Sequence, residues 1–529
     1  GLIGDPPAAP ALIKALQRGQ SVRVAHHALR ALRSRELASL PQVRTALEQA
    51  RRTRRDCGAP GGPSLADQPA NSFVLRCFDR DYDDLSLPNL SYESALCADG
   101  TGRIIQWGSH GRRYDSPQTG LTWLFNVKAG NWRRPAPKQE PPGICMTRGI
   151  VCDTTRGLVM ATRVPTGMGG HGYVMYLRKF AAFSVPWVFD IAAGEWYPMR
   201  PAPHPGSAGY VGACFDWRND AVLVLKNGVQ VYDTHANTWT SLAPEPRPDV
   251  VRGCPPSAYD PVSGRFVVVI GADERGRVMT WAYDLAANTW TDLNSSNPPP
   301  ALGDAPMVYD SANDAMLAFR RGGGRTSLYA YHPRENRWES LPATGPSPDY
   351  ALFDAAYDPV NNVTVLCGGE DASCSGEPGV RETWTYRYRP AAKKTVGASD
   401  APRALRLDIS SDGAVRLSWS RPAAEAHGYH VYRGTGDHPW VADFRRITEK
   451  PLQTTEFTDP EKLGSAVHYY RVVPVGPDGE EGFASNIVRT QPLPVREVFA
   501  ARGSDGSVGL SWACSAGPAV AGYNVYRAP

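Results

Sequence analysis

The chain has 529 residues, too many for a single hydrophobic core, and its formal charge of +4 is small for this length. We therefore expect three or four domains, and the charge gives no reason to expect nucleic acid as a partner. No apolar run reaches the roughly 18 residues of a membrane-spanning helix, so no membrane span is expected. The ten cysteines form no CxxC pair, which argues against zinc ribbons and attached haem.

Residues 1–70 are predicted to be a small α-helical segment followed by a linker. Apolar residues recur at helical spacing in residues 10–16 and 21–25, and a third helix is expected near residues 40–55. The first two helices resemble one HEAT-type repeat. Such a pair cannot bury its apolar stripe alone, so it is expected either to follow a larger array or to dock elsewhere.

A repeated pattern follows, in which an aromatic residue, a short polar turn and a tryptophan recur about every 50 residues, a period typical of propellers, solenoids or arrays. The five complete copies are Phe125/Trp132, Phe189/Trp196, Tyr232/Trp239, Tyr283/Trp290 and Tyr331/Trp338. An incomplete sixth copy lies at Trp384 to Tyr386. Two further strands are expected before each copy, with first strands near Cys97, Val151, Cys214, Ala258, Val308 and Ala356. Each unit is thus one four-stranded sheet.

This pattern resembles the kelch-repeat β-propellers, whose glycine doublet is matched by Gly368-Gly369 and by Gly322-Gly323-Gly324. The resemblance implies a mainly β fold with a six-bladed propeller over residues 71–392. The sixth blade lacks its last strand, and residues 72–78 form an unassigned strand upstream. Because a ring must close, we predict that residues 72–78 pair into the sixth blade and complete it.

Beyond a polar linker, Leu417-Ser418-Trp419 and a later Tyr469-Tyr470-Arg471-Val472 resemble a fibronectin type III module over residues 400–492. In this module Trp419 is the expected core residue, with Tyr429, Val431, Tyr470 and Val472 pointing inward. Leu510-Ser511-Trp512 repeats the first of these segments. Residues 493–529 are therefore expected to be part of a second module, completed by continuation of the chain or by strands from another polypeptide.

The sequence contains no Ser/His/Asp nucleophile elbow, P-loop or metalloprotease helix, and no cofactor or metal is expected. One aspartate per repeat lies at the end of a first strand: Asp99, Asp153, Asp216, Asp260, Asp310 and Asp358. A carboxylate ring could hold a cation, but an aspartate at a turn start accepts backbone N–H bonds, and we favour this structural interpretation. The same interpretation applies to Asp190, Asp233 and Asp284. Copper-radical oxidases share the propeller and sandwich order, but their histidine ligand motif is not found here.

Loop length suggests where the protein binds. The loops between second and third strands are long in the first blade (108–121), the second (163–186) and the sixth (368–381), and these blades are neighbours once the ring closes. Loops built on a rigid scaffold commonly carry function, and aromatic residues mixed with arginine are typical of binding hot spots. The predicted binding residues are His110, Arg112, Arg113, Tyr114, His171, Tyr173, Tyr176, Arg178, Lys179, Phe180 and Phe183. The alternative is that these loops only fill space or pack on the helical segment.

Cys367 and Cys374 flank a short loop and are a candidate disulfide in an oxidising compartment. Together these features favour a non-enzymatic binding or scaffold subunit outside the cytoplasm, whether periplasmic, secreted or on the cell surface, with other protein subunits as partners. The alternative is a carbohydrate-binding or sugar-processing protein of the kelch type.

Overall fold

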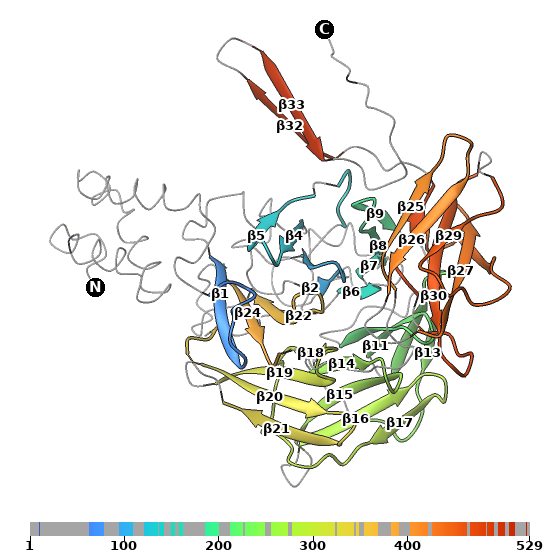
Figure 1. Cartoon of the computed structure of the whole chain (residues 1–529). Coiled ribbons are helices and arrows are strands. Elements are labelled where there is room, and N and C mark those ends of the chain that lie inside the picture. Colours follow the sequence, from blue (N-terminus) through green and yellow to red (C-terminus); the bar gives the residue numbers. More distant parts are fainter. Residues whose placement is uncertain are drawn as a thin grey trace, which may run out of the picture.

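Figure 1 shows the computed structural model, in which the elements of the described residues are the strands β1 to β33. The structure describes residues 63–78, 95–108, 121–135, 137–141, 150–153, 158–161, 186–199, 212–225, 228–248, 255–272, 278–322, 325–342, 345–348, 354–368, 382–390, 402–421, 426–462, 466–482, 484–490, 496–502 and 507–513, with residues 10 and 525. The protein is mainly β in these parts. The helical segment predicted for residues 1–70 falls outside them, apart from residues 10 and 63–70. The described part of the chain contains no helix long and apolar enough to cross a membrane.

Six four-stranded antiparallel sheets, numbered here from 1 to 6, follow one another along the chain. Sheet 1 consists of β2 (Ala95–Ala98), β3 (Arg103–Trp107), β4 (Thr122–Asn126) and β5 (Asn131–Arg133). Sheet 2 consists of β6 (Ile150–Asp153), β7 (Leu158–Ala161), β8 (Trp187–Asp190) and β9 (Glu195–Pro198). Sheet 3 consists of β10 (Ala213–Asp216), β11 (Ala221–Leu225), β12 (Val229–Asp233) and β13 (Thr238–Leu242).

The remaining sheets have the same order of strands. Sheet 4 consists of β14 (Ser257–Asp260), β15 (Arg265–Ala272), β16 (Val278–Asp284) and β17 (Thr289–Asp292). Sheet 5 consists of β18 (Met307–Asp310), β19 (Ala315–Gly322), β20 (Arg325–His332) and β21 (Arg337–Leu341). Sheet 6 consists of β22 (Asp354–Asp358), β23 (Val363–Cys367), β24 (Glu382–Arg387) and β1 (Ser72–Phe78). The six first strands predicted from the sequence are confirmed.

The recurring aromatic and tryptophan lie opposite each other on the third and fourth strands of each sheet. In sheets 1 to 5 the two rings have centroids between 5.0 and 5.2 Å apart, as in Phe125–Trp132 and Tyr331–Trp338. Where the aromatic is tyrosine, its hydroxyl donates to an asparagine in the turn, at 2.8 Å for Tyr331 and Asn336. Asn336 has a φ of 47°, a conformation that asparagine tolerates better than most residues. The repeated sequence pattern therefore builds one hairpin with a fixed turn.

The first strand of the described chain supplies the missing parts of sheet 6. β1 pairs antiparallel with β24, and Phe73 lies opposite Tyr386 with ring centroids 4.8 Å apart. Tyr386 donates its hydroxyl to Asn71 at 2.5 Å, and Asn71 has a φ of 54°. Phe73 and Asn71 thus take the places that Trp338 and Asn336 have in sheet 5. The pairing predicted for residues 72–78 is confirmed.

Tryptophans of the fourth strands also connect neighbouring sheets. The indole N–H of Trp196 in sheet 2 donates to Thr122 Oγ1 in sheet 1 at 2.7 Å, and Trp338 in sheet 5 donates to Thr280 Oγ1 in sheet 4 at 3.0 Å. Trp132 in sheet 1 donates to Thr383 Oγ1 in sheet 6 at 2.9 Å. First strands contact one another in the order β2, β6, β10, β14, β18 and β22, and β22 contacts β2 (Figure 1). Sheet 6 is therefore a neighbour of both sheet 5 and sheet 1.

Residues 403–489 form a sandwich of two antiparallel sheets. One sheet contains β25 (Arg403–Ile409), β26 (Val415–Ser420) and β29 (Glu456–Thr458). The other contains β28 (Asp443–Arg446), β27 (Gly428–Thr435), β30 (His468–Val475) and β31 (Val488–Arg489). The predicted core residues Trp419, Tyr429, Val431, Tyr470 and Val472 are all buried in one cluster between the sheets, which confirms their assignment.

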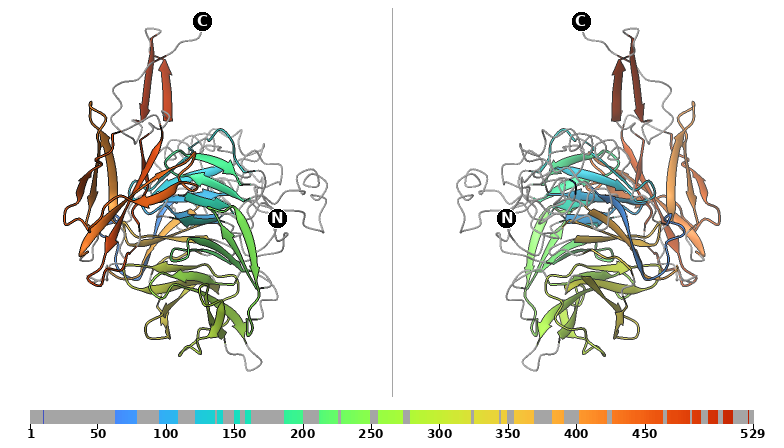
Figure 2. Two further views of the ribbon diagram at one scale, coloured as in Figure 1. Left: turned by 90° about the vertical axis from the view of Figure 1, so that its right-hand side faces the viewer. Right: turned by 90° about the vertical axis from the view of Figure 1, so that its left-hand side faces the viewer.

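A separate hairpin follows the sandwich. It consists of β32 (Arg496–Arg502) and β33 (Val508–Ala513), and it stands away from both the sandwich and the six sheets (Figure 2). Val508 and Leu510 are exposed. Leu417, which occupies the place in β26 that Leu510 has in β33, is 1% exposed. The hairpin therefore has the first two strands expected for residues 493–529 and leaves apolar side chains uncovered.

Candidate functional site

The predicted binding residues all belong to loops outside the described part of the chain. The structure does describe the strands that carry these loops. The first loop joins β3 to β4, the second joins β7 to β8, and the third joins β23 to β24. Because β22 contacts β2 and β2 contacts β6, the three loops are carried by neighbouring sheets. Within each antiparallel sheet the second-to-third connection lies at the end opposite to the first-to-second and third-to-fourth turns. The prediction that the eleven loop residues form one surface remains a prediction.

A carboxylate lies at the base of the first of these loops. The chain returns from the loop at Thr122, whose hydroxyl donates to Glu140 Oε2 at 2.5 Å and accepts the indole N–H of Trp196. Burial raises the pKa of Glu140, and the bonds from Thr122 and the charge of Arg134, 3.6 Å away, only partly offset this effect. A half-buried carboxyl with a raised pKa beside a loop is a feature that functional sites share. Sequence reasoning missed Glu140 because it lies in a connection between sheets and belongs to no motif.

The once-per-repeat aspartates have structural roles. Asp216, Asp260 and Asp310 each accept, at 3.0 Å, a backbone N–H from the residue two positions further on. Asp99 and Asp358 do the same, at 2.8 and 3.0 Å. The aspartates of the later turns, Asp190, Asp233 and Asp284, accept the N–H three positions on. The turn interpretation is confirmed for these residues, while the turn after Asp153 lies outside the described part.

Neighbouring sheets use the same carboxylates. Tyr259 of sheet 4 donates its hydroxyl to Asp216 of sheet 3 at 2.5 Å, and burial, followed by the charge of Asp216, raises the pKa of Tyr259. The oxygens of Asp216 are thus occupied by protein donors. Among the described residues no group of histidine, cysteine, aspartate and glutamate side chains has an arrangement suited to a metal ion.

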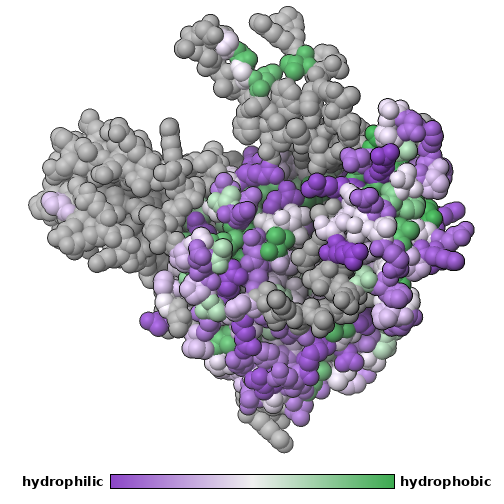
Figure 3. Space-filling view, viewed as in Figure 1, coloured by the Kyte–Doolittle hydropathy of each residue, from purple (hydrophilic) through white to green (hydrophobic). Residues whose placement is uncertain are grey.

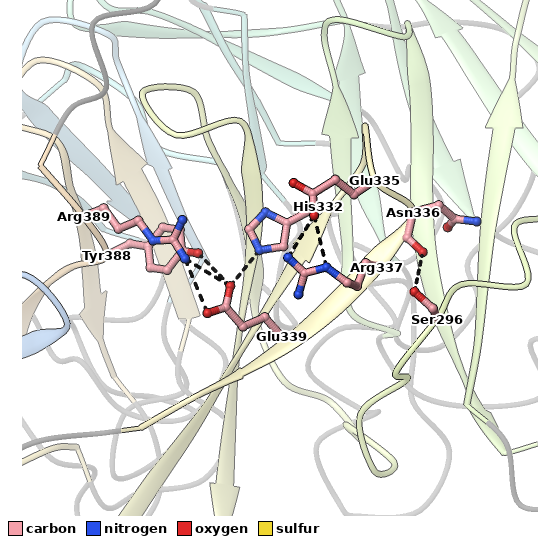
Figure 4. Close-up of polar contacts among 8 residues, drawn as sticks. All are labelled: Ser296, His332, Glu335, Asn336, Arg337, Glu339, Tyr388 and Arg389. Carbon is pink, nitrogen blue, oxygen red and sulfur yellow. Dashed lines mark hydrogen bonds and ion pairs between the residues drawn. The ribbon is translucent and has the colours of Figure 1, made fainter.

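His332, the last residue of β20, belongs to a polar cluster between sheets 5 and 6 (Figure 4). Its Nε2 lies 2.9 Å from Glu339 Oε2, which also accepts Arg389 at 3.1 Å and the hydroxyl of Tyr388 at 3.3 Å. Burial alone would raise the pKa of Glu339, but the His332 bond and the Arg389 charge hold it below its ordinary value. These hydrogen bonds and the ion pair join sheets 5 and 6.

Cysteines within the described strands behave mainly as core residues. Cys97 and Cys214 are buried, while Cys152 is half-buried. Cys367 is fully buried at the end of β23 with a free thiol, and burial raises its pKa. Cys374, its proposed disulfide partner, lies outside the described residues, so this pairing stays a prediction.

The described surface contains no second site of comparable promise. In the face seen in Figure 3 the six sheets present mainly hydrophilic side chains, with apolar ones scattered between them. Val262 and Val360, the exposed large apolar residues of the six sheets, lie in first-to-second turns of two sheets that are not neighbours. Isolated exposed valines need no partner. The three loops therefore remain the best candidate site.

Comparisons with known proteins give no further guidance. No protein-family model matches the chain, and no curated protein matches it. An Fn3-like protein from Clostridium thermocellum is 24% identical over 18% of this chain and 95% of its own, with a TM-score of 0.16. Pectate lyase PelI from Erwinia chrysanthemi is 29% identical, covering 16% of this chain and 27% of its own, with a TM-score of 0.15. A protein of unknown function from Bacteroides thetaiotaomicron is 11% identical over 59% of this chain and 75% of its own, with a TM-score of 0.39. Scores this low carry no argument about fold or function.

Proposed function

We propose that the six sheets are the blades of a kelch-like propeller, that the sandwich is a fibronectin type III module, and that the protein is a non-enzymatic binding or scaffold subunit acting outside the cytoplasm. Its binding surface consists of the three long loops of sheets 1, 2 and 6, and its partner is another protein. The observation that carries this proposal is the position of the loops. All three leave from neighbouring sheets of one repeated scaffold, whose own polar groups serve structural bonds.

The repeated connections support the architecture. The Trp–Thr bonds join sheet 1 to 2, 4 to 5 and 6 to 1, and the contacts between first strands return from sheet 6 to sheet 1. A scaffold fastened in this way holds the strand ends that carry the loops at fixed separations. Preorganisation of the scaffold reduces the conformational freedom lost on binding, which favours recognition of a partner surface.

The composition of the loops supports a protein partner. Tyr176, Arg178, Phe180 and Phe183 combine large aromatic rings with a guanidinium, and these residue types are enriched at protein–protein interfaces relative to the rest of the surface. Among its described residues, the scaffold beneath them has no group of histidine, cysteine, aspartate and glutamate side chains suited to a metal ion. The fibronectin-like sandwich suits a location outside the cytoplasm by family association, and this location is part of the proposal.

The test is a binding measurement with matched variants. A protein retained by the full chain from its native source would first be purified, and its affinity would then be measured for the wild type and the double variant Phe180→Ser/Phe183→Ser. Removing two hot-spot rings should weaken binding at least a hundredfold, since each is expected to contribute about 2 kcal/mol. The control is Val262→Ser/Val360→Ser, which removes exposed apolar side chains from the opposite end of the sheets.

Unchanged affinity of the phenylalanine variant, or an equal loss in the control, would place the contact elsewhere. A glycan array probed with the same chain addresses the alternative. Specific binding of a sugar that the loop variant abolishes would replace the protein partner with a carbohydrate ligand.

A further inference from the structure

The Trp–Thr bond is absent from the junction of sheets 2 and 3, as it is from those of sheets 3 and 4 and of sheets 5 and 6, where Val229 and Leu328 occupy the acceptor position. The acceptor threonine lies three residues before the third-strand aromatic, as Thr122 does before Phe125 in sheet 1. In sheet 2 this position is Pro186, which has no hydroxyl. Its backbone is placed as in the other sheets, since its carbonyl accepts the N–H of Met199 at 2.8 Å just as Thr280 accepts Leu293. Sheets 2 and 3 therefore cannot be joined by this bond.

The sandwich inserts an aromatic side chain at the same junction. Trp440, in the connection between β27 and β28, is 3% exposed and belongs to a core cluster with residues of both sheets, among them Val188 and Met199 of sheet 2 and Val224 of sheet 3. The ring of Trp440 lies 5.1 Å from that of Tyr197 on β9. A tryptophan buried in this way removes a large apolar area from water, so the contact stabilises both partners.

A histidine extends this aromatic contact. The ring of His438 stacks on Trp440 with centroids 4.5 Å apart and an angle of 9° between the planes, and it lies 4.7 Å from the ring of Tyr197. Burial lowers the pKa of His438, which keeps the imidazole neutral within this stack near pH 7. Three rings from two parts of the chain thus form one packed group.

An ion pair holds the sandwich on sheet 2 at a second point. Arg489 of β31 donates to Asp190 Oδ2 at 2.6 Å, and their side chains are 14% and 3% exposed. Asp190 ends β8 and also accepts the N–H of Ala193 in the following turn. Removing one partner of such a buried pair leaves a charge without compensation, so the pair fixes the orientation in which the sandwich docks.

We propose that the sandwich is a brace for sheet 2. Trp440 takes over the role of the missing Trp–Thr bond between sheets 2 and 3, and the Arg489–Asp190 pair sets the docking angle. Sheet 2 carries the longest of the three loops, residues 162–185, between β7 and β8. The brace therefore positions a part of the surface that the proposed function assigns to binding. In this respect the inference rests on the proposed function, whereas the bracing itself does not.

Hydrogen exchange on the full chain tests the brace without any partner. Trp440→Ala should accelerate exchange at least tenfold in β8 and β9, because sheet 2 loses its support from the sandwich. Strands β16 of sheet 4 and β20 of sheet 5 should exchange as in the wild type, because the Trp338–Thr280 bond joins these two sheets independently of the sandwich. The control variant is Arg445→Ala, which removes an arginine that is 82% exposed on the same sandwich.

Wild-type exchange in β8 and β9 of the Trp440→Ala variant would overturn the proposal. If that variant also lost protection in β27 and β30, the sandwich itself would have opened, and Arg489→Ala becomes the deciding variant. It should loosen β8 while β27 and β30 stay protected, and unchanged exchange in β8 would then refute the brace.

Binding of the purified partner separates the two proposals. Faster exchange in β8 together with unchanged affinity would keep the brace and exclude loop 162–185 from the contact surface.

Discussion

Asn71 offers the sharpest test of how β1 is held in sheet 6, because its side chain bonds to two residues far away in the sequence and because Asn336 makes the equivalent bonds in sheet 5. Its side chain accepts from Tyr386 at 2.5 Å and donates to the carbonyl of Pro342 at 2.6 Å. Asn336 makes the same two bonds in sheet 5, to Tyr331 and to the carbonyl of Leu293. The difference is that Asn336 lies within a continuous hairpin, whereas Asn71 joins strands far apart in sequence.

The magnitudes follow from these bonds and from the backbone. Asn71→Gly removes two side-chain hydrogen bonds, each worth about 0.5–1.5 kcal/mol, and keeps a residue that tolerates a φ of 54°. Asn71→Ala removes the same bonds and adds about 1–2 kcal/mol for a left-handed alanine. We expect losses of about 2 kcal/mol for glycine and about 3–4 kcal/mol for alanine in the free energy of opening β1.

Native-state hydrogen exchange measures this quantity locally. At about 1.4 kcal/mol per factor of ten, Asn71→Gly should accelerate exchange in β1 and at the facing edge of β24 roughly 30-fold, and Asn71→Ala several-fold more. Asn336→Gly and Asn336→Ala are the matched controls, with the same ordering expected in β21. Unchanged exchange in β1 alongside the expected effect in β21 would show that Asn71 is not the equivalent of Asn336.

Three further predictions concern bonds between and beside the sheets. Thr383→Val removes the acceptor of the Trp132 indole N–H and should destabilise the contact of sheets 6 and 1 by about 1–3 kcal/mol. Hydrogen exchange in β5 and β24 should become faster, and exchange at the wild-type rate in these strands would show that the bond contributes nothing. Glu140→Gln should gain stability relative to the wild type as pH rises above 4.5, because a carboxyl whose folded pKa is raised loses its contribution to folding stability as it ionises. Urea unfolding at pH 4, 6 and 8 measures the difference in unfolding free energy between the two proteins, and a difference that stays constant with pH would contradict the prediction. Glu339 has a lowered pKa, so the stability that its charge contributes should be present above pH 4.5 and lost in acid. Glu339→Gln should therefore match the wild type in unfolding free energy near pH 3 and be less stable at pH 7, and an equal loss of stability at both pH values would rule out a role for the charge.

The repeated elements could be predicted from sequence because each repeat uses the same local chemistry. An aromatic, a turn with asparagine or aspartate and a tryptophan recur at fixed spacing, so the hairpins and the first strands are visible in a single chain. The completion of sheet 6 was predicted from the missing strand alone. The side chain that β1 contributes opposite Tyr386 was not predicted, because phenylalanine stands at position 73 where the other sheets have tryptophan. Phe73 shares a core cluster with Leu328 of sheet 5, which occupies the acceptor position and has no hydroxyl.

The contacts between domains could not be predicted in this way. Trp440 and Tyr197 each look like ordinary apolar residues, and only the folded chain brings them together. The absence of a threonine at position 186 gave no distinct signal, because positions 229 and 328 also lack one. The same holds for Asp190, whose turn role was predicted while its pairing with Arg489 was not. Packing between distant segments depends on shape, which a sequence period does not specify.

The most direct test of the proposed binding surface is a cross-linking map of the full chain bound to the partner that it retains from its native source. Cross-links should fall in residues 109–120, 162–185 and 369–381, with few in the first-to-second turns of sheets 3 to 5. A map concentrated on those turns or on the outer strands β13, β17 and β21 would contradict the account, because it would place the partner on the scaffold and not on the loops that it carries.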